Sequence, residues 1–232
     1  MNKFYILFGG KFENKQPNST FKILWCGRFM STKVPQIILP ALRKIIDCGY
    51  DVSLTYLGAI EEQTSKNLVD KYVKKYKLEE YVQFISNVES NKVREIMYSH
   101  HILAMTSNYE EGWGAVVSEA MNEGCVIVGS AAAGSIGFLI KEGKNGFVFN
   151  YRSVESLFLA LQKAVSLDDD KFLMMATEAY KTIECEWNGK IAARRLYYSS
   201  IKYLETGKME FALSGPFSQA PHIKNMKQLI TE

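Results

Sequence analysis

The chain has 232 residues, a formal net charge of +3 and 47% hydrophobic residues. This composition is close to the globular average, which excludes a largely disordered chain, a coiled coil and a collagen-like fibre. The small positive charge lacks the strong basic bias of nucleic-acid-binding domains, so no nucleic-acid partner is expected. At ~150 residues per domain, the length fits one or two domains.

The cysteines and the apolar runs of the sequence indicate in which cellular compartment the protein is expected. None of the four cysteines forms a C-x-x-C pair or stands beside a histidine at metal-ligand spacing. Isolated cysteines are typical of a reducing compartment. The apolar run Phe4–Phe8 is shorter than the core of a secretory signal, and no run approaches a membrane span of about 18 apolar residues. We therefore expect a soluble, cytoplasmic protein.

Short apolar strands alternate with amphipathic helices along the chain. A strand at Ile23–Cys26 ends at a glycine, and a helix is predicted over Pro35–Asp47, where apolar residues recur at helical spacing. The pattern then repeats, with strands at Val52–Leu57, Val82–Ile85, Ile102–Thr106, Val126–Val128 and Gly146–Phe149, and helices at 60–77, Asn91–Tyr98, Trp113–Asn122, 153–166, 170–184 and 189–205.

This alternation predicts an α/β fold: a single Rossmann-like, doubly wound parallel sheet with helices on both faces. We expect a polar leader or linker at 1–20, the folded domain at 21–207 and a C-terminal tail at 208–232. Ligands of such sheets bind outside the carboxyl ends of the strands. The turns that follow the strands are therefore the places where functional residues are expected.

Two common nucleotide-binding motifs are missing. There is no G-x-G-x-x-G fingerprint, which disfavours a dinucleotide enzyme such as a nucleotide-sugar epimerase. The stretch Gly129–Gly134 matches the first half of a P-loop, but Ser135 and Ile136 follow where lysine and serine or threonine belong. A P-loop NTPase is disfavoured for that reason.

Two cations follow the first strand. Arg28 and Lys33 stand five residues apart after Gly27, where they can converge on a diphosphate. Arginine offers bidentate hydrogen bonds and lysine a compact point charge. An ordinary solvated loop is the alternative interpretation of this stretch.

A second cluster runs from Glu111 to Met121. Gly112 and Gly114 would let the backbone approach a ligand, and a helix N-terminus after them would suit phosphate. Glu119 follows Glu111 by eight residues, about 12 Å if the stretch were helical. This spacing suits the two ends of a sugar nucleotide. Alternatively, Glu111 only complements a helix dipole and Glu119 is a solvated helix residue.

Together, these clusters resemble the C-terminal lobe of a family-four retaining glycosyltransferase with a GT-B fold, the lobe that binds the nucleotide sugar. The resemblance covers about residues 20–207. It rests on Gly27-Arg28 with Lys33, the E-x7-E pattern of Glu111 and Glu119, and the later glycines Gly124, Gly134, Gly143 and Gly146.

The resemblance implies a role for each matching position. Arg28, Lys33 and Glu111 would be the catalytic residues, with the two cations neutralising the diphosphate and Glu111 orienting the donor sugar. Glu119 would hold the ribose and Val88 would lie near the nucleobase. No metal or other cofactor is expected, because the cations supply the positive charge. The implied donor-binding residues are Gly27, Gly58, Val88, Gly112, Trp113, Gly114, Ala115, Val116 and Glu119.

The implied activity is transfer of a hexose from a UDP- or GDP-sugar to a polysaccharide or glycoconjugate acceptor, as in capsule or lipopolysaccharide biosynthesis. In this family the acceptor site lies on an N-terminal lobe, yet only about twenty residues precede the first strand here. We therefore expect activity to need an N-terminal lobe or partner chain, at the inner face of the membrane. The alternative is a non-catalytic, truncated module that docks on a partner glycosyltransferase chain.

Two residues depart from the family pattern. Val34 stands where the family often has glycine, which is expected to change the loop, and Trp113 replaces a commoner phenylalanine, which is expected to reshape the sugar pocket. His100 and His101 precede a strand, where neighbours point to opposite faces, so joint metal binding is not expected. The basic, tyrosine-rich helix Ile191–Leu204 is interpreted as a solvated amphipathic helix, with contact to a membrane surface or second lobe as the alternative.

Overall fold

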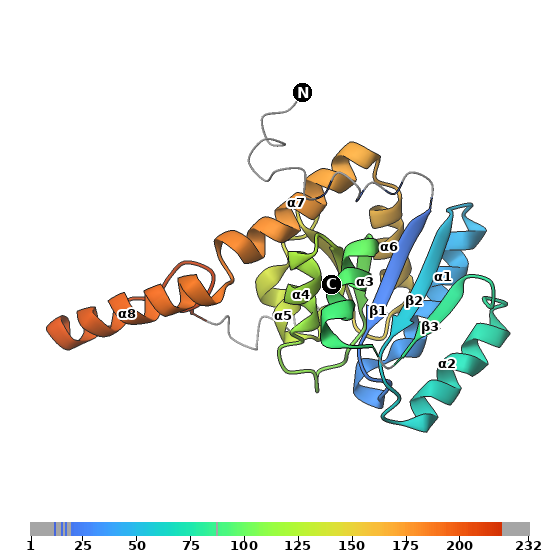
Figure 1. The fold of residues 1–232 in the computed structure, drawn as a ribbon, viewed down its shortest axis with the longest axis horizontal. Helices are drawn as coiled ribbons and strands as arrows, with labels where there is room; N and C mark the ends of the chain where they lie inside the picture. Colours follow the sequence, from blue (N-terminus) through green and yellow to red (C-terminus); the bar gives the residue numbers. More distant parts are fainter. Residues whose placement is uncertain (1–11, 13–14, 16, 18–19, 87, 220–232) are drawn as a thin grey trace.

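The computed structural model describes residues 12, 15, 17, 20–86 and 88–219 (Figure 1). Within them lies one six-stranded sheet in the order β3-β2-β1-β4-β5-β6, with every neighbouring pair parallel. This confirms the predicted single doubly wound α/β sheet. The strands are β1 (Phe21–Cys26), β2 (Val52–Leu57), β3 (Val82–Ile85), β4 (Ile102–Met105), β5 (Val126–Ser130) and β6 (Gly146–Phe149).

Helices cover both faces of the sheet (Figure 1). Apolar side chains of α1, α2 and α6 pack in one cluster, those of α3, α4 and α5 pack in the other, and α7 contributes to both. The helices are α1 (Ile38–Asp47), α2 (Gln63–Lys75), α3 (Ser90–Ser99), α4 (Val116–Asn122), α5 (Gly134–Leu139), α6 (Val154–Val165), α7 (Asp169–Cys185) and α8 (Gly189–Thr206), with short 3-10 turns η2 (Ser31–Lys33) and η3 (Pro35–Ile37).

The central strands are apolar on both sides because both faces are covered. Ile23 of β1 belongs to one cluster and its neighbour Leu24 to the other, and both are fully buried. Val126, Ile127 and Val128 alternate in the same way on β5. Such continuous apolar runs are typical of parallel strands with helices on both faces.

The strand order reverses between β1 and β4, the point at which open α/β sheets form a crevice at the carboxyl ends of their strands. The chain runs outward from β1 to β3, then returns to the other side of β1 and continues to β6. The loops after β1 and β4 therefore lead to helices on opposite faces. This reversal point, at the carboxyl ends of the strands, is where open α/β sheets bind their ligands.

The helix predicted over Trp113–Asn122 starts later than expected, which corrects that prediction. The helix α4 begins at Val116, and Trp113 and Gly114 belong to the preceding loop. Gly114 has a φ of +77°, which a right-handed helix cannot contain. The short helix α5 was not predicted at all, because two of its six residues are glycines with poor helix propensity.

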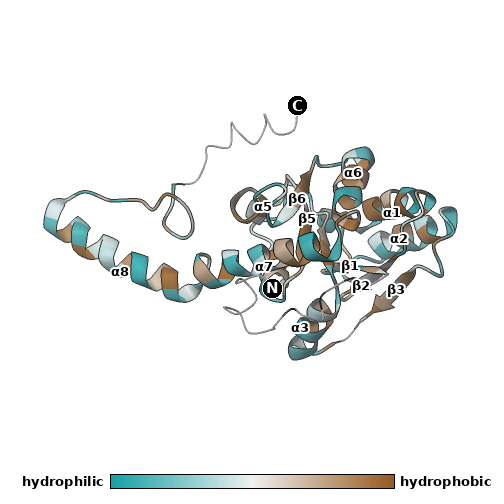
Figure 2. Ribbon diagram, turned by 90° about the horizontal axis from the view of Figure 1, so that it is seen from above, coloured by the Kyte–Doolittle hydropathy of each residue, from teal (hydrophilic) through white to brown (hydrophobic). Residues whose placement is uncertain are grey.

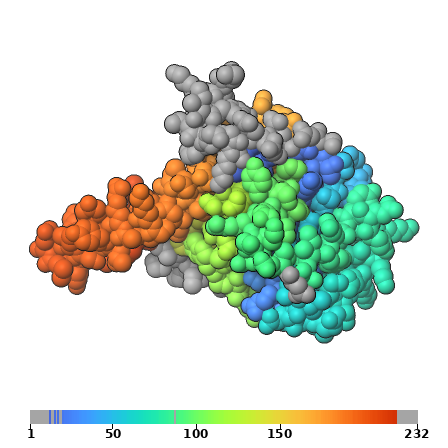
Figure 3. Space-filling model, in the orientation of Figure 1, coloured from blue at the N-terminus to red at the C-terminus, as the bar shows by residue number. Residues whose placement is uncertain are grey.

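Parts of the leader and tail pack onto the folded body. Phe12 and Lys15 are only 5% and 1% exposed, and Lys15 Nζ donates a hydrogen bond to the Met97 carbonyl at 3.0 Å. At the other end, α8 leaves the body and no residue on it is buried (Figures 1 and 3). The segment after it folds back, where Arg195 NH1 donates to the carbonyls of Ser214 and Pro216 at 2.6 and 2.7 Å.

The surface of α8 mixes polar and apolar residues along its length (Figure 2). Leu196, Tyr197 and Leu204 are exposed on it. Among the described residues, no helix combines the length and apolar character that crossing a bilayer needs.

The two adjacent histidines are structural. His101 Nδ1 accepts a hydrogen bond from the Lys22 amide at 2.9 Å, and His100 Nε2 lies 2.8 Å from Thr55 Oγ1. Burial, with the nearby charges of Lys15 and Lys22, lowers the pKa of His101 to about 3. The neutral imidazole is therefore built into the fold, and the two rings make separate contacts, as the strand geometry predicted.

The lowered pKa of His101 predicts acid-sensitive stability. Between about pH 6.5 and pH 3 the unfolded chain binds a proton there and the folded chain does not, so the free energy of unfolding falls as the pH falls through this window. The loss attributable to this group is on the order of 5 kcal/mol. In urea titrations across this pH range, His101→Phe should reduce the slope of stability against pH by about one proton. An unchanged slope would contradict this assignment.

The close approach of two backbone segments predicts that Gly58 is essential to the fold. Gly58 has a φ of +151°, and a Cβ there would overlap the Gly27 carbonyl oxygen. We expect Gly58→Ala to lower the free energy of unfolding in urea by about 2–4 kcal/mol, because both the strained φ and the overlap oppose it. Gly137→Ala is the control, since its Cβ meets open space within α5, and should be neutral or stabilising. Equal stability of the two variants would refute the prediction.

Candidate functional site

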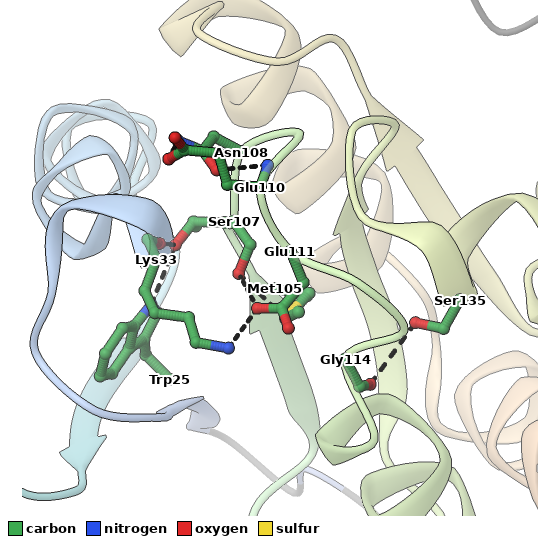
Figure 4. Close-up of polar contacts among 10 residues, drawn as sticks. Trp25, Lys33, Met105, Ser107, Asn108, Glu110, Glu111, Gly114 and Ser135 are labelled. Carbon is green, nitrogen blue, oxygen red and sulfur yellow. Dashed lines mark hydrogen bonds and ion pairs between the residues drawn. The ribbon is translucent and has the colours of Figure 1, made fainter. Parts of the chain in front are cut away.

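The residues predicted from sequence meet at the crevice between β1 and β4. The loop after β1 carries Lys33, and the loop after β4 carries Ser107 and Glu111 (Figure 4). The strand order places these two loops side by side, although 78 residues separate Lys33 from Glu111. The site therefore exists only in the folded sheet.

A lysine–glutamate ion pair joins the two loops. Lys33 Nζ contacts Glu111 Oε2, and Ser107 Oγ donates a hydrogen bond to the same carboxylate oxygen at 2.9 Å. The side chains of Lys33 and Glu111 are only 20% and 13% exposed. Such a pair is screened less by solvent than a surface pair, and removing one partner strands the charge of the other.

A buried hydrogen-bond relay fixes the backbone beneath this pair. Trp25 Nε1 donates to Thr106 Oγ1 at 2.9 Å, and that hydroxyl donates to the Lys33 carbonyl at 2.7 Å (Figure 4). The Asn108 amide donates to the Thr32 carbonyl at 2.8 Å. Because the relay links β1, η2 and the end of β4, the lysine and the glutamate are held in register with each other.

Val34 has a backbone conformation that is unusual for its residue type. Its φ of +46° and ψ of 49° lie in the left-handed region, where a β-branched residue is an outlier. Glycine adopts this conformation without a steric penalty. A glycine, which the resemblance leads one to expect here, would adopt this conformation without strain, whereas Val34 adopts it under strain.

The carbonyls of the loop from Gly112 to Ala115 accept hydrogen bonds from the amides of other residues. The amides of Gly134 and Ser135 donate to the carbonyls of Gly112 and Trp113 at 3.1 and 2.9 Å. In the described part of the chain, no protein acceptor receives the amides of residues 112–115. This leaves a run of backbone donors, which suits an anionic or hydroxyl-rich ligand.

Two glycines make this arrangement possible. Gly114 is in the left-handed region, and a Cβ on it would lie 2.7 Å from Met105 Cε. A Cβ on Gly134 would overlap the Gly112 carbonyl oxygen. Gly112 is different, because a Cβ there would meet nothing within 4 Å. The fold therefore does not require glycine at position 112, and the open space beside it is available to a ligand.

Arg28 is not part of the ion-paired cluster in this structure. Its guanidinium pairs with Glu61 at 2.8 Å, and the two side chains are 60% and 48% exposed. Exposed pairs of this kind contribute little to stability, so Arg28 can exchange Glu61 for another anion at small cost. The sequence predicted convergence of Arg28 and Lys33, and Glu61 was not anticipated as a partner.

Glu119 is an exposed residue on α4 whose charge reaches the floor of the crevice. Burial raises the pKa of the Cys26 thiol to about 12, and the negative charge of Glu119 adds to this shift while Lys33 opposes it. Cys26 thus stays protonated between the two charged groups. Glu119 and Lys33 therefore both influence the end of β1 electrostatically, and their expected roles toward a ligand stay predictions.

The remaining predicted residues line the rim or the loop. Gly58 accompanies Gly27 at the strand ends, with its amide donating to the Ile85 carbonyl at 3.0 Å. Val88 is half-buried against the apolar cluster that contains α3. Ala115 is the N-cap of α4 and Val116 its first residue.

Trp113 directs its ring toward other aromatic residues. The ring lies 5.5 Å from the Phe138 ring and 5.4 Å from the Trp187 ring, between centroids, and the residue is 39% exposed. The expectation that Trp113 reshapes the sugar pocket stays a prediction. What the structure adds is that Trp113 anchors its loop to α5 and to the α7–α8 junction.

Sequence reasoning missed the supporting residues. Thr106 was placed only at the end of a predicted strand and Ser107 was given no role, although each makes a hydrogen bond that supports the site. Ser135 was noted only for failing the P-loop pattern, yet its amide holds the carbonyl of Trp113 in the loop of residues 112–115. Polar residues directly after a buried strand are a usable signal for such support. Within the described residues, no three histidine, cysteine, aspartate or glutamate side chains are grouped as metal ligands would be.

Comparison with known proteins identifies the family. Residues 10–182 match the family described as glycosyl transferases group 1. Spore coat protein SA of Bacillus subtilis (strain 168) is 29% identical over 133 residues, covering 55% of this chain and 34% of that protein. The D-inositol 3-phosphate glycosyltransferase of Corynebacterium aurimucosum is 26% identical over 157 residues, covering 66% and 36%. The chain thus spans about a third of the length of these relatives.

Solved structures share the fold. The C-terminal domain of a glycosyl transferase group 1 family protein (LpcC) from Francisella tularensis superposes with a TM-score of 0.64 at 21% identity, covering 75% of this chain and 90% of that one. HepE from Anabaena in complex with UDP-glucose superposes with a TM-score of 0.63 at 21% identity, covering 79% and 49%. The family match, on the fold that these structures share, establishes that the chain belongs to the glycosyl transferases group 1 family and forms its C-terminal lobe.

Proposed function

We propose that this lobe binds a nucleoside diphosphate sugar in the crevice between β1 and β4, as the donor of a hexosyltransferase. The observation that carries the proposal is the Lys33–Glu111 pair beside the free amides of residues 112–115. One cation and a row of backbone donors suit a diphosphate, and a carboxylate suits sugar hydroxyls. HepE, a structural neighbour, is described in complex with UDP and with UDP-glucose, which supports this ligand class.

The ion pair implies an exchange on binding. Lys33 would leave Glu111 for the diphosphate, and Glu111 would then accept hydrogen bonds from the sugar. Arg28 would exchange its exposed partner Glu61 for the same diphosphate. Glu119 would hold the ribose hydroxyls, and Val88 would lie beside the nucleobase. Each of the two cations would thus exchange a carboxylate for the diphosphate, while Glu111 would exchange a cation for neutral hydroxyl donors.

The proposed reaction is transfer with retention at the anomeric carbon. The bond from that carbon to the β-phosphate oxygen breaks, and its electron pair leaves with the diphosphate. The acceptor hydroxyl oxygen forms the new bond on the same face, and its proton passes to the departing diphosphate. Lys33 and Arg28 stabilise the charge that develops there, commonly the largest single contribution to catalysis. No metal is invoked, because these cations carry the charge.

The acceptor side is proposed to lie outside this lobe. UDP- or GDP-hexose would be the donor and a polysaccharide or glycoconjugate the acceptor, with capsule or lipopolysaccharide synthesis at the cytoplasmic membrane face as the setting. A second lobe or partner chain would supply the acceptor site. Calorimetry of this chain with UDP, GDP and their sugars tests the donor half alone. No binding of any of them at millimolar concentration would overturn the proposal.

Two substitutions separate the roles of the ion pair. Lys33→Ala should weaken nucleoside diphosphate binding about 10- to 100-fold, because a charge-assisted hydrogen bond is lost. Glu111→Gln should strengthen binding of the bare diphosphate about two- to tenfold, since Lys33 no longer has a prior partner, and should weaken binding of the sugar-bearing donor. Both effects are measured by calorimetry.

Lys44→Ala is the matched control for that pair of variants. Lys44 also pairs with a glutamate, Glu155, but the pair is exposed and links α1 to α6. Its removal should leave nucleotide affinity unchanged. If Lys33→Ala binds as well as Lys44→Ala does, the proposed role of Lys33 is wrong.

A further inference from the structure

The donor-binding loop is held from two directions. Its carbonyls are fixed by the amides of Gly134 and Ser135 at the start of α5. Its one large side chain, Trp113, packs on the rings of Phe138 and Trp187. Trp113 is 39% exposed, and among the described residues these two rings are the aromatic partners of its side chain.

Trp187 lies at the junction between α7 and α8, where hydrogen bonds fix the backbone. Its amide donates to the Thr182 carbonyl at 2.9 Å, which ties it to the last turn of α7. The next residue, Asn188, caps α8 by accepting from the Ile191 amide at 3.0 Å, and its side chain donates to the Ile183 carbonyl at 3.1 Å. The ring of Trp187 is therefore presented to the loop from a backbone that is fixed on both sides.

The support extends to a second layer. The Thr182 hydroxyl accepts a hydrogen bond from Asn145 Nδ2 at 3.0 Å, and the same amide group donates to the Leu139 carbonyl at 2.9 Å. Leu139 is the last residue of α5, the helix that carries Phe138. Phe138 and Trp187 are thus joined both by their rings, at 5.9 Å between centroids, and through Asn145.

We propose that Trp187 is a positioning residue for the donor-binding loop: through its contact with Trp113, it holds the amides of residues 112–115 in the orientation that receives the donor. Trp187 itself does not touch the Lys33–Glu111 pair in the structure. This inference rests on the proposed function for its effect on ligand affinity. Its effect on the loop is independent of which ligand binds.

The test compares three variants of the full chain. Trp187→Ala removes the ring, Trp187→Phe keeps an aromatic ring in its place, and Tyr198→Ala is the control, because it removes an exposed aromatic side chain from α8 that packs on Tyr197. Hydrogen exchange measures the amides of residues 112–115, and calorimetry measures affinity for UDP-glucose and GDP-mannose. Near-UV circular dichroism reports the coupling of the Trp113 and Trp187 rings.

Trp187→Ala should speed exchange of these amides and weaken donor affinity about three- to tenfold, as expected for the loss of an aromatic pair. Trp187→Phe should restore both to within about twofold, and Tyr198→Ala should change neither. Wild-type exchange rates and affinity in a folded Trp187→Ala chain would overturn the inference. If Trp187→Ala does not fold, Trp187→Leu replaces it under the same criteria.

Failure of the proposed function gives a different result. If the wild-type chain binds neither nucleotide sugar, the proposed ligand is wrong, and the exchange rates alone decide whether Trp187 holds the loop. Faster exchange at residues 112–115 in Trp187→Ala would then still support the positioning role. Unchanged exchange would overturn it.

Discussion

The ion pair between Lys33 and Glu111 is the interaction on which the site depends. It joins the loop after β1 to the loop after β4, and it is more than three-quarters shielded from solvent on both sides. Each of the two charges is neutralised by the other, and the Ser107 hydroxyl donates a further hydrogen bond to the Glu111 carboxylate. A ligand that replaces this pair must satisfy a cation and an anion together, as a sugar attached to a diphosphate does.

The rest of the fold serves to bring these two loops together. Strand order puts β1 beside β4. The buried hydrogen bond from the Thr106 hydroxyl to the Lys33 carbonyl fixes the backbone of Lys33 relative to the sheet. Glycine at position 114 allows the left-handed turn within the loop of residues 112–115. The aromatic contacts of Trp113 then anchor that loop to α5 and to the α7–α8 junction. Stability and the proposed chemistry thus share the same few contacts.

Much of this architecture could be predicted from the sequence, for identifiable reasons. Short strand-like segments bounded by turn residues are a local signal, so Val52–Leu57, Val82–Ile85 and Gly146–Phe149 were placed at their observed bounds. Predictions from local sequence failed where contacts between distant residues determine the structure. The start of α4 depends on the left-handed Gly114, and α5 forms despite its glycines because Gly112 and Trp113 supply acceptors for its first amides. The partner of Arg28, Glu61, lies 33 residues away, beyond the reach of any spacing argument.

The most direct measurement of this account is a crystal structure of the chain soaked with UDP or GDP. In that complex the diphosphate should lie in the crevice between β1 and β4, contacted by Lys33 and by the amides of residues 112–115. The Lys33–Glu111 pair should be open in that complex. A nucleotide bound elsewhere, or one bound in the crevice with the ion pair intact, would contradict the central claim.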